Sequence, residues 1–220
     1  MPDRTPTQPP SDRTRIRRIA KKAAYDRATI DAILDAQPVA HVGYAIDGAP
    51  FVTPTLQWRE GDHVYWHGSA ASRMLERCDG AEVCVTVTLV DGLVLARSAF
   101  NHSVNYRSVM LLGRARLVSD PAEKEARLRR FVDALFPGRW DELRPATVQE
   151  IKATSVLGLA IDEASAKIRQ GPPKDEAEDY ALPVWAGVIP LRTEVLAPVD
   201  DPKLAPGIAV PDNVRGFRLG

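Results

Sequence analysis

The sequence lacks the features that would place it in a membrane, outside the cell or on nucleic acid. No apolar run approaches the roughly 20 residues of a membrane-spanning helix, and the N-terminus has no apolar signal core. Two cysteines, Cys78 and Cys84, are too few for a disulfide framework, and Cys84 lies in an apolar strand pattern typical of a buried thiol. Lys plus Arg equals Asp plus Glu, at 29 each, which predicts neither a nucleic-acid partner nor a membrane surface. We expect a soluble, cytoplasmic protein.

The chain of 220 residues is long enough to bury a core, and we expect one domain with two appendages. Residues 1–20 are rich in Pro and Arg and predict a flexible basic arm. Residues 21–195 contain the periodic apolar segments of the domain itself. Residues 196–220 carry spaced prolines, which indicate an extended C-terminal tail.

Three helix signals accompany a longer series of strand signals. Asp26 is a predicted N-cap, Asp120 caps a second helix whose apolar stripe includes Leu128 and Phe131, and Thr147 starts a shorter third helix. Strands are predicted over residues 39–46, 51–58, 63–67, 83–90, 93–100, 106–118, 155–161 and 184–191. This pattern predicts a mainly β fold with peripheral helices, built as a small antiparallel barrel.

Two Asp-Gly pairs, Asp47-Gly48 and Asp91-Gly92, stand between neighbouring strand signals. Asp-Gly favours the left-handed conformations of the tightest hairpin turns, so both pairs predict such turns.

The stretch YWHGSAASRML, residues 65–75, is the strongest candidate for a binding site. A strand leads through small residues into a helix that begins near Arg73. Backbone N–H groups and hydroxyls converge in such a loop, the helix terminus adds positive potential, and Arg73 adds a planar charged fork. The pattern predicts a phosphate cradle, with a capped surface turn as the alternative.

Four blocks, YWHGSAASRML, DGLVLARSAFNHSVNYRSV, MLLGRA and PVWAGVIP, follow one another along the chain. On these blocks, residues 25–191 resemble the pyridoxamine 5′-phosphate oxidase-like FMN-binding split barrels, and within them the flavin-nucleotide-binding or nitroimidazole-resistance-like branch. The resemblance implies a six-stranded antiparallel split β-barrel of Greek-key topology. It also implies a homodimer with FMN in each of two clefts at the subunit interface.

The resemblance further implies which residues bind FMN. Ser72 and Arg73 match a Ser-Arg pair that holds the phosphate, whereas Met74 stands where relatives carry a second cation. Ser108 would face the cofactor, and Trp185 would contact the flavin across the interface. The implied cofactor-binding residues are His67, Gly68, Ser69, Ser72, Arg73, Met74, Arg107, Ser108 and Trp185.

Two departures from the oxidases argue against pyridoxamine phosphate as the substrate. The segment PFVTPTLQW contains no Lys, and no Arg-containing substrate block follows Trp185. We expect instead an FMN-dependent oxidoreductase that acts on another small organic molecule, with NADH or NADPH as electron source. Flavin supplies the redox chemistry, so no catalytic residue is assigned. The alternatives are a flavin carrier or sensor without turnover, and a haem-binding protein with His67 or His102 as ligand.

Two further groups of residues are candidates for other sites. His63, Tyr65 and His67 share one strand face, but no carboxylate or Cys completes a metal site there, so we expect no metal ion. Lys167 and Arg169 lie either at the rim of the cofactor cleft or at the cationic end of a helix.

Overall fold

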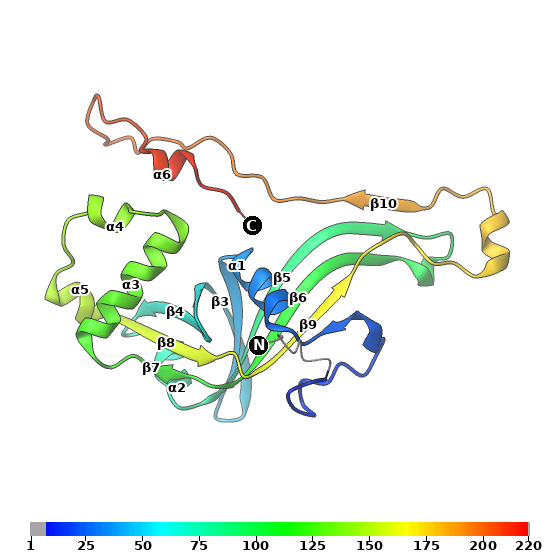
Figure 1. Ribbon diagram of the computed structural model, residues 1–220, viewed down its shortest axis with the longest axis horizontal. Coiled ribbons are helices and arrows are strands. Elements are labelled where there is room, and N and C mark those ends of the chain that lie inside the picture. The colour runs from blue at the N-terminus through cyan, green and yellow to red at the C-terminus, as the bar shows by residue number, and fades with distance from the viewer. Residues whose placement is uncertain (1–7, 220) are drawn as a thin grey trace, which may run out of the picture.

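The computed structural model describes residues 8–219 and shows a mainly β protein with few helices (Figure 1). The strands lie along one antiparallel sheet in the order β1-β9-β6-β5-β2-β3-β4-β8-β7, and β10 pairs with β5 outside this path. The strands are β1 (Ala23–Ala24), β2 (Val39–Ile46), β3 (Ala49–Glu60), β4 (His63–Ser69), β5 (Glu82–Leu95), β6 (Ser103–Arg114), β7 (Arg116–Leu117), β8 (Thr154–Ala160), β9 (Glu163–Arg169) and β10 (Gly187–Pro190). The helices are α1 (Arg27–Asp35), α2 (Arg73–Cys78), α3 (Pro121–Leu135), α4 (Arg139–Glu142), α5 (Val148–Ala153) and α6 (Asp212–Arg215), with short 3₁₀ turns η1 (Ala20–Lys22), η2 (Ala99–Asn101) and η3 (Ala177–Ala181).

One hydrophobic core joins strands that are far apart along the sheet. Trp66 of β4, Val85 of β5, Leu111 of β6 and Leu159 of β8 are all at most 1% exposed and belong to this core. Helix α1, capped as predicted by Asp26, packs its apolar face into the same core. Because distant strands share one core, the sheet curls into a barrel.

Helices α3, α4 and α5 form a lobe outside the barrel, at the end opposite the arm made by β5, β6 and β10 (Figure 1). A second cluster lies beneath α3, where Trp58 and Tyr65 pack against Leu128 and Phe131. Asp120 caps α3 as predicted, yet no side chain of α3 is fully buried. The predicted apolar stripe of α3 therefore faces the barrel without being sealed by it. Among residues 8–219, no helix combines the length and apolarity that crossing a membrane requires.

The two Asp-Gly pairs have different structures. Asp47 (φ 50°) and Gly48 (φ 80°) form the predicted tight turn between β2 and β3. The predicted turn at Asp91-Gly92 is wrong, because β5 runs through both residues with a bulge between Val90 and Gly92. The carboxylate of Asp91 accepts hydrogen bonds of 2.8 and 3.0 Å from Arg107 on β6, which holds Asp91 in the strand.

Gly92 also allows β10 to lie close against β5. A Cβ at position 92 would be 2.9 Å from the carbonyl oxygen of Ile189 in β10. Beyond β10 the chain runs back as a tail towards the α3–α5 lobe (Figure 1). The ring of Phe217 lies 5.0 Å from that of Phe136, and Asn213 donates a 2.9 Å hydrogen bond to Glu142. The tail is thus attached at both ends.

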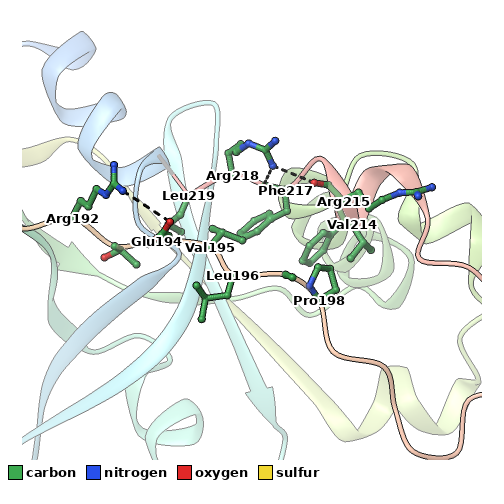
Figure 2. A pocket seen from close by; sticks show the side chains of 13 residues that line it. Arg192, Glu194, Val195, Leu196, Pro198, Val214, Arg215, Phe217, Arg218 and Leu219 are labelled. Atoms are coloured by element: carbon green, nitrogen blue, oxygen red, sulfur yellow. Dashed lines mark hydrogen bonds and ion pairs between the residues drawn. The ribbon is translucent and has the colours of Figure 1, made fainter.

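The two passes of the tail enclose a hollow of about 790 Å³. Figure 2 shows Arg192, Arg215 and Arg218 around it, together with Phe217 and Leu196. Apart from Phe136, every residue that lines this hollow lies beyond β10, between Arg192 and Leu219, and none belongs to the predicted phosphate loop.

We expect Gly92→Ala to loosen β10, because the backbone carbonyl of Ile189 cannot move away by changing a rotamer. Overpacking of this kind costs about 1–3 kcal/mol, so local opening of β10 should become roughly 5- to 150-fold more populated. Limited proteolysis near residues 184–190 measures it. Gly43→Ala is the matched control, since its Cβ would make an ordinary 3.4 Å contact with the Cys84 carbonyl. Equal cleavage of the two variants would contradict the close-approach argument.

The structure corrects two other expectations. Residues 163–169 form strand β9, so Lys167 and Arg169 are not at a helix end. Arg169 is 9% exposed and donates a hydrogen bond to Asn105. Part of the predicted flexible arm packs on the sheet, since Thr14 is 1% exposed and Arg13 pairs with Glu82 and Glu163. Residues 1–7 of that arm lie outside the described residues.

Candidate functional site

The loop between β4 and α2, residues 70–72, carries the predicted phosphate cradle. The Ser69 hydroxyl accepts a 3.2 Å hydrogen bond from the Ala71 N–H, and the Ser72 N–H donates to the Ser69 carbonyl at 2.9 Å. Ser72 is the N-cap of α2, but its side chain makes no capping hydrogen bond. The Ser72 hydroxyl and the first N–H groups of α2 are therefore available to an external acceptor.

Arg73 extends from this loop with its guanidinium lying over the ring of Phe51, at 4.9 Å from the ring centroid. No carboxylate within the described residues forms an ion pair with Arg73. The aromatic ring fixes the direction of the side chain by a cation–π contact and uses none of its N–H donors. Arg73 can thus offer its planar fork to a phosphate group.

Gly68 and Met74 shape this loop from below. A Cβ on Gly68 would lie 3.0 Å from Leu75, so glycine lets α2 pack tightly against β4. Met74 is 7% exposed and its side chain belongs to the barrel core. The side chain of Met74 therefore packs beneath the loop and does not reach its surface. Arg73 is the cation at the surface of the loop.

The other predicted flavin residues lie away from this loop. Arg107 is paired with Asp91, as described above. Ser108 lines a cavity of about 300 Å³ on the β5–β6–β9 face, together with Lys167. Trp185 precedes β10, is 65% exposed and packs its ring against Gly187. The structure brings together residues 67–74 and leaves Arg107, Ser108 and Trp185 on other elements, so a contact of Trp185 with flavin across an interface stays a prediction.

His67 points towards a cavity that the sequence did not predict. The cavity has a volume of about 520 Å³ and lies between β4, β8 and the α3–α5 lobe. Its lining is mostly apolar and consists of His67, Leu128, Phe131, Val132, Trp140, Leu143, Arg144, Ala146, Glu150, Ile151 and Thr154. This empty volume explains why the apolar stripe of α3 is only half-buried.

The imidazole of His67 is held between aromatic rings. Its centroid lies 4.7 Å from that of Phe131 and 5.9 Å from that of Trp58. Its Nδ1 atom is buried and has no hydrogen-bond partner within the described residues. Burial lowers the pKa of His67, so the neutral imidazole prevails at pH 7. Because Nδ1 is inaccessible, Nε2 is the ring nitrogen that a ligand in the cavity could reach. Neutral imidazole is the form that binds metal centres.

Sequence reasoning identified His67 but missed the residues across the cavity from it, chiefly Trp140, Arg144 and Glu150. The one available signal was the capping box at Thr147 and Glu150, which is present in the structure and starts α5 as predicted. Nothing in the local pattern indicated that this helix lines the same cavity as His67, because its packing on α3 and β8 depends on the chain path between those two elements.

Comparison with known proteins gives consistent results. The profile of the pyridoxamine 5′-phosphate oxidase family matches residues 26–168. The flavocytochrome Anf3 from Azotobacter vinelandii is 56% identical, with a TM-score of 0.94, and the match covers 97% of this chain and 100% of that one. The FAD and haem binding protein from Mycobacterium smegmatis is 40% identical, with a TM-score of 0.85 and coverage of 89% and 97%.

A more distant structure, a protein of Bacteroides thetaiotaomicron assigned to 5-nitroimidazole antibiotic resistance, is 22% identical with a TM-score of 0.54. The match covers 66% of this chain and 86% of that one, and at this identity it shows the fold alone. No curated protein sequence matches the chain.

Proposed function

Because the chain belongs to the pyridoxamine 5′-phosphate oxidase family, we propose that it is a redox protein of this family that binds both a flavin and haem. The observation that carries this proposal is the half-buried imidazole of His67, which lines a largely apolar cavity of about 520 Å³ and makes no hydrogen bond within the described residues. The cavity volume lies within the roughly 300–1,000 Å³ typical of ligand sites. Two relatives, at 56% and 40% identity over nearly the whole chain, are described as a flavocytochrome and as an FAD and haem binding protein.

We place the flavin phosphate at the loop of residues 70–72, where Ser72 and Arg73 offer a free hydroxyl and a free guanidinium fork. The sequence favoured FMN. The relative from M. smegmatis is described as binding FAD, and we therefore propose FAD as the bound flavin. Arg73 and Ser72 suit a phosphate of either nucleotide, since both flavins carry one next to the ribityl chain.

We place haem in the cavity that His67 faces. Haem iron is commonly held by one histidine, and the apolar side chains of Leu128, Phe131 and Ile151 suit the faces of a porphyrin. His102, the other histidine considered for this role, is exposed, and its Nδ1 lies 3.0 Å from the Ser98 carbonyl. His67 is half-buried and lines the apolar cavity, which favours it over His102 as the ligand.

The two proposed sites are carried by one strand and its continuation. His67 lies on β4 and Arg73 begins the helix that follows, with only the short loop between them. When bound, flavin and haem supply two-electron and one-electron chemistry, respectively. The contribution of the chain is to hold the phosphate at Arg73, to orient the imidazole of His67, and to keep water from that imidazole with Phe131 and Trp58.

We also propose that the protein works as a homodimer. Large apolar side chains are exposed on the extension made by β5, β6 and β10 and on the chain before and after β10. Among them are Phe100 at 99%, Trp185 at 65%, Leu196 at 77% and Val199 at 94%. Apolar surface of this extent commonly marks an interface between copies. A second copy would also supply the partner surface that the predicted role of Trp185 requires.

The purified protein should show both the broad flavin bands and a Soret band, and mass spectrometry of the released cofactors should identify FAD and haem b. Sedimentation of the same sample should show a dimer.

NADH or NADPH remains our proposed electron source for a small-molecule substrate. Anaerobic mixing of the protein with NADH or NADPH should bleach the flavin absorption, whereas a flavin carrier without turnover would show no bleaching. Protein that takes up neither flavin nor haem on reconstitution would refute the proposed function.

A further inference from the structure

The cavity that His67 faces has an uneven distribution of charge. Most of the residues that line it are apolar. Its two charged residues, Arg144 and Glu150, form an ion pair with each other. The side chains of Arg144 and Glu150 are 68% and 49% exposed, whereas Nδ1 of His67 is buried. The charged pair thus marks the mouth of the cavity, and the imidazole marks its interior.

Arg144 is held in place at this mouth by its neighbours. Its Nη1 donates to the Pro145 carbonyl at 3.0 Å and to one Glu150 oxygen at 2.9 Å, while Nη2 donates to the other Glu150 oxygen at 2.5 Å. A guanidinium group has five N–H donors, so Nε and one hydrogen on Nη2 remain for a further acceptor. Arg144 is therefore positioned but not saturated.

Glu150 is in turn fixed to the start of α5. It accepts hydrogen bonds from the Thr147 N–H at 2.8 Å and from the Thr147 hydroxyl at 3.0 Å. The hydrogen bonds from Arg144 and Thr147 lower the pKa of Glu150 to about 2, so it stays ionised and keeps hold of Arg144. The fork of Arg144 is thereby tied by hydrogen bonds to the N-terminal end of α5.

Haem carries two carboxylate side chains on one edge of an otherwise apolar ring. A ring that entered this cavity by its apolar edge, with one face against His67, would leave the carboxylate edge at the mouth, where Arg144 is the single cation among the lining residues. Charge-assisted contacts between arginine and carboxylates are among the stronger hydrogen bonds in proteins.

We propose that Arg144 is the anchor for the haem propionates and so fixes which edge of the porphyrin faces solvent. This inference rests on the proposed haem-binding function. It assigns to Arg144 a binding role that its exposed ion pair with Glu150 would not by itself suggest, since surface ion pairs contribute little to stability.

The test compares haem with its dimethyl ester, which lacks the propionate charges. The full chain is titrated with each porphyrin while the Soret band is followed. Arg144→Ala should weaken binding of haem by about 10- to 100-fold and leave binding of the ester nearly unchanged. Arg144→Lys, which keeps the charge but loses the fork, should fall between Arg144→Ala and the unchanged protein.

Two controls separate this role from others. Arg139→Ala removes an exposed arginine of the same lobe that pairs with Glu142 but does not line the cavity, and it should affect neither titration. The double variant Arg144→Ala/Glu150→Gln should bind haem as weakly as Arg144→Ala does. That result would show that the loss of affinity does not come from the Glu150 charge left unpaired in Arg144→Ala. Gln at position 150 preserves the capping box. Equal losses for haem and ester in Arg144→Ala, or no loss at all, would overturn the anchor. Failure of the unchanged protein to bind either porphyrin would overturn the proposed haem function together with it.

Discussion

Replacing His67 with alanine should yield a protein that keeps its flavin but binds haem poorly, with a weak and shifted Soret band. His67 is the one histidine that lines the cavity, so its removal would leave the iron of a bound haem without a protein ligand there. Loss of an outer-shell partner alone costs roughly 10- to 100-fold in metal affinity, and loss of the ligand itself should exceed that. Absorption spectra of the purified variant, with flavin as an internal reference, measure the effect.

His102→Ala is the matched control for this experiment, because His102 was the other candidate ligand and is exposed. It should leave the haem spectrum unchanged. Added imidazole should partly restore the Soret band of His67→Ala, since a free ligand can enter the space that the side chain vacates. A normal spectrum for His67→Ala, or a lost Soret band for His102→Ala, would contradict the assignment of the haem site to the cavity beside His67.

Replacing Arg73 with alanine should weaken the binding of FAD and FMN far more than that of riboflavin. Arg73 presents a free fork at the loop, and riboflavin has no phosphate to contact it. A hydrogen bond to a charged group contributes about 1.5–3 kcal/mol, so affinity for the nucleotides should fall by about 10- to 100-fold. Met74 cannot compensate, because its side chain is buried in the core. Paired fluorescence titrations with the three ligands measure the difference.

Arg77→Ala provides the control for Arg73→Ala, since it removes an exposed arginine from the last turn of the same helix. It should change none of the three affinities. If Arg73→Ala weakened riboflavin as much as the nucleotides, Arg73 would support the fold of the loop, and the phosphate site would have to lie on another element.

The sequence allowed the local elements to be predicted better than their assembly. Asp26, Asp120 and Thr147 each start the helix that they were expected to start, because an N-cap acts within a few residues. The same dipeptide gave opposite results at Asp47-Gly48 and Asp91-Gly92. At the second pair, Arg107 on β6 and the close approach of β10 decide the conformation, and neither is visible in the local pattern.

The candidate site shows the same division. The loop that ends at Arg73 was found because its signal is continuous along the chain. The cavity was missed because its walls come from β4, α3 and α5, which are separate in sequence and meet only in the fold. His67 illustrates the limit: its strand face could be predicted from the alternation with Tyr65, but not what that face meets.

The close contact at Gly92 has a consequence for how the molecule is made. One edge of β5 pairs with β6, and its other edge is shared between β2, at Cys84–Thr86, and β10, at Gly92–Leu95. During synthesis from the N-terminus, β2, β5 and β6 emerge well before β10. Until β10 has been made, the outer edge of the arm is an open row of backbone donors and acceptors that any extended segment, including one from a neighbouring nascent chain, can pair with. The bulge beside Gly92 and the brevity of that stretch limit this exposure, and in the folded protein β10 covers the edge at Gly92–Leu95.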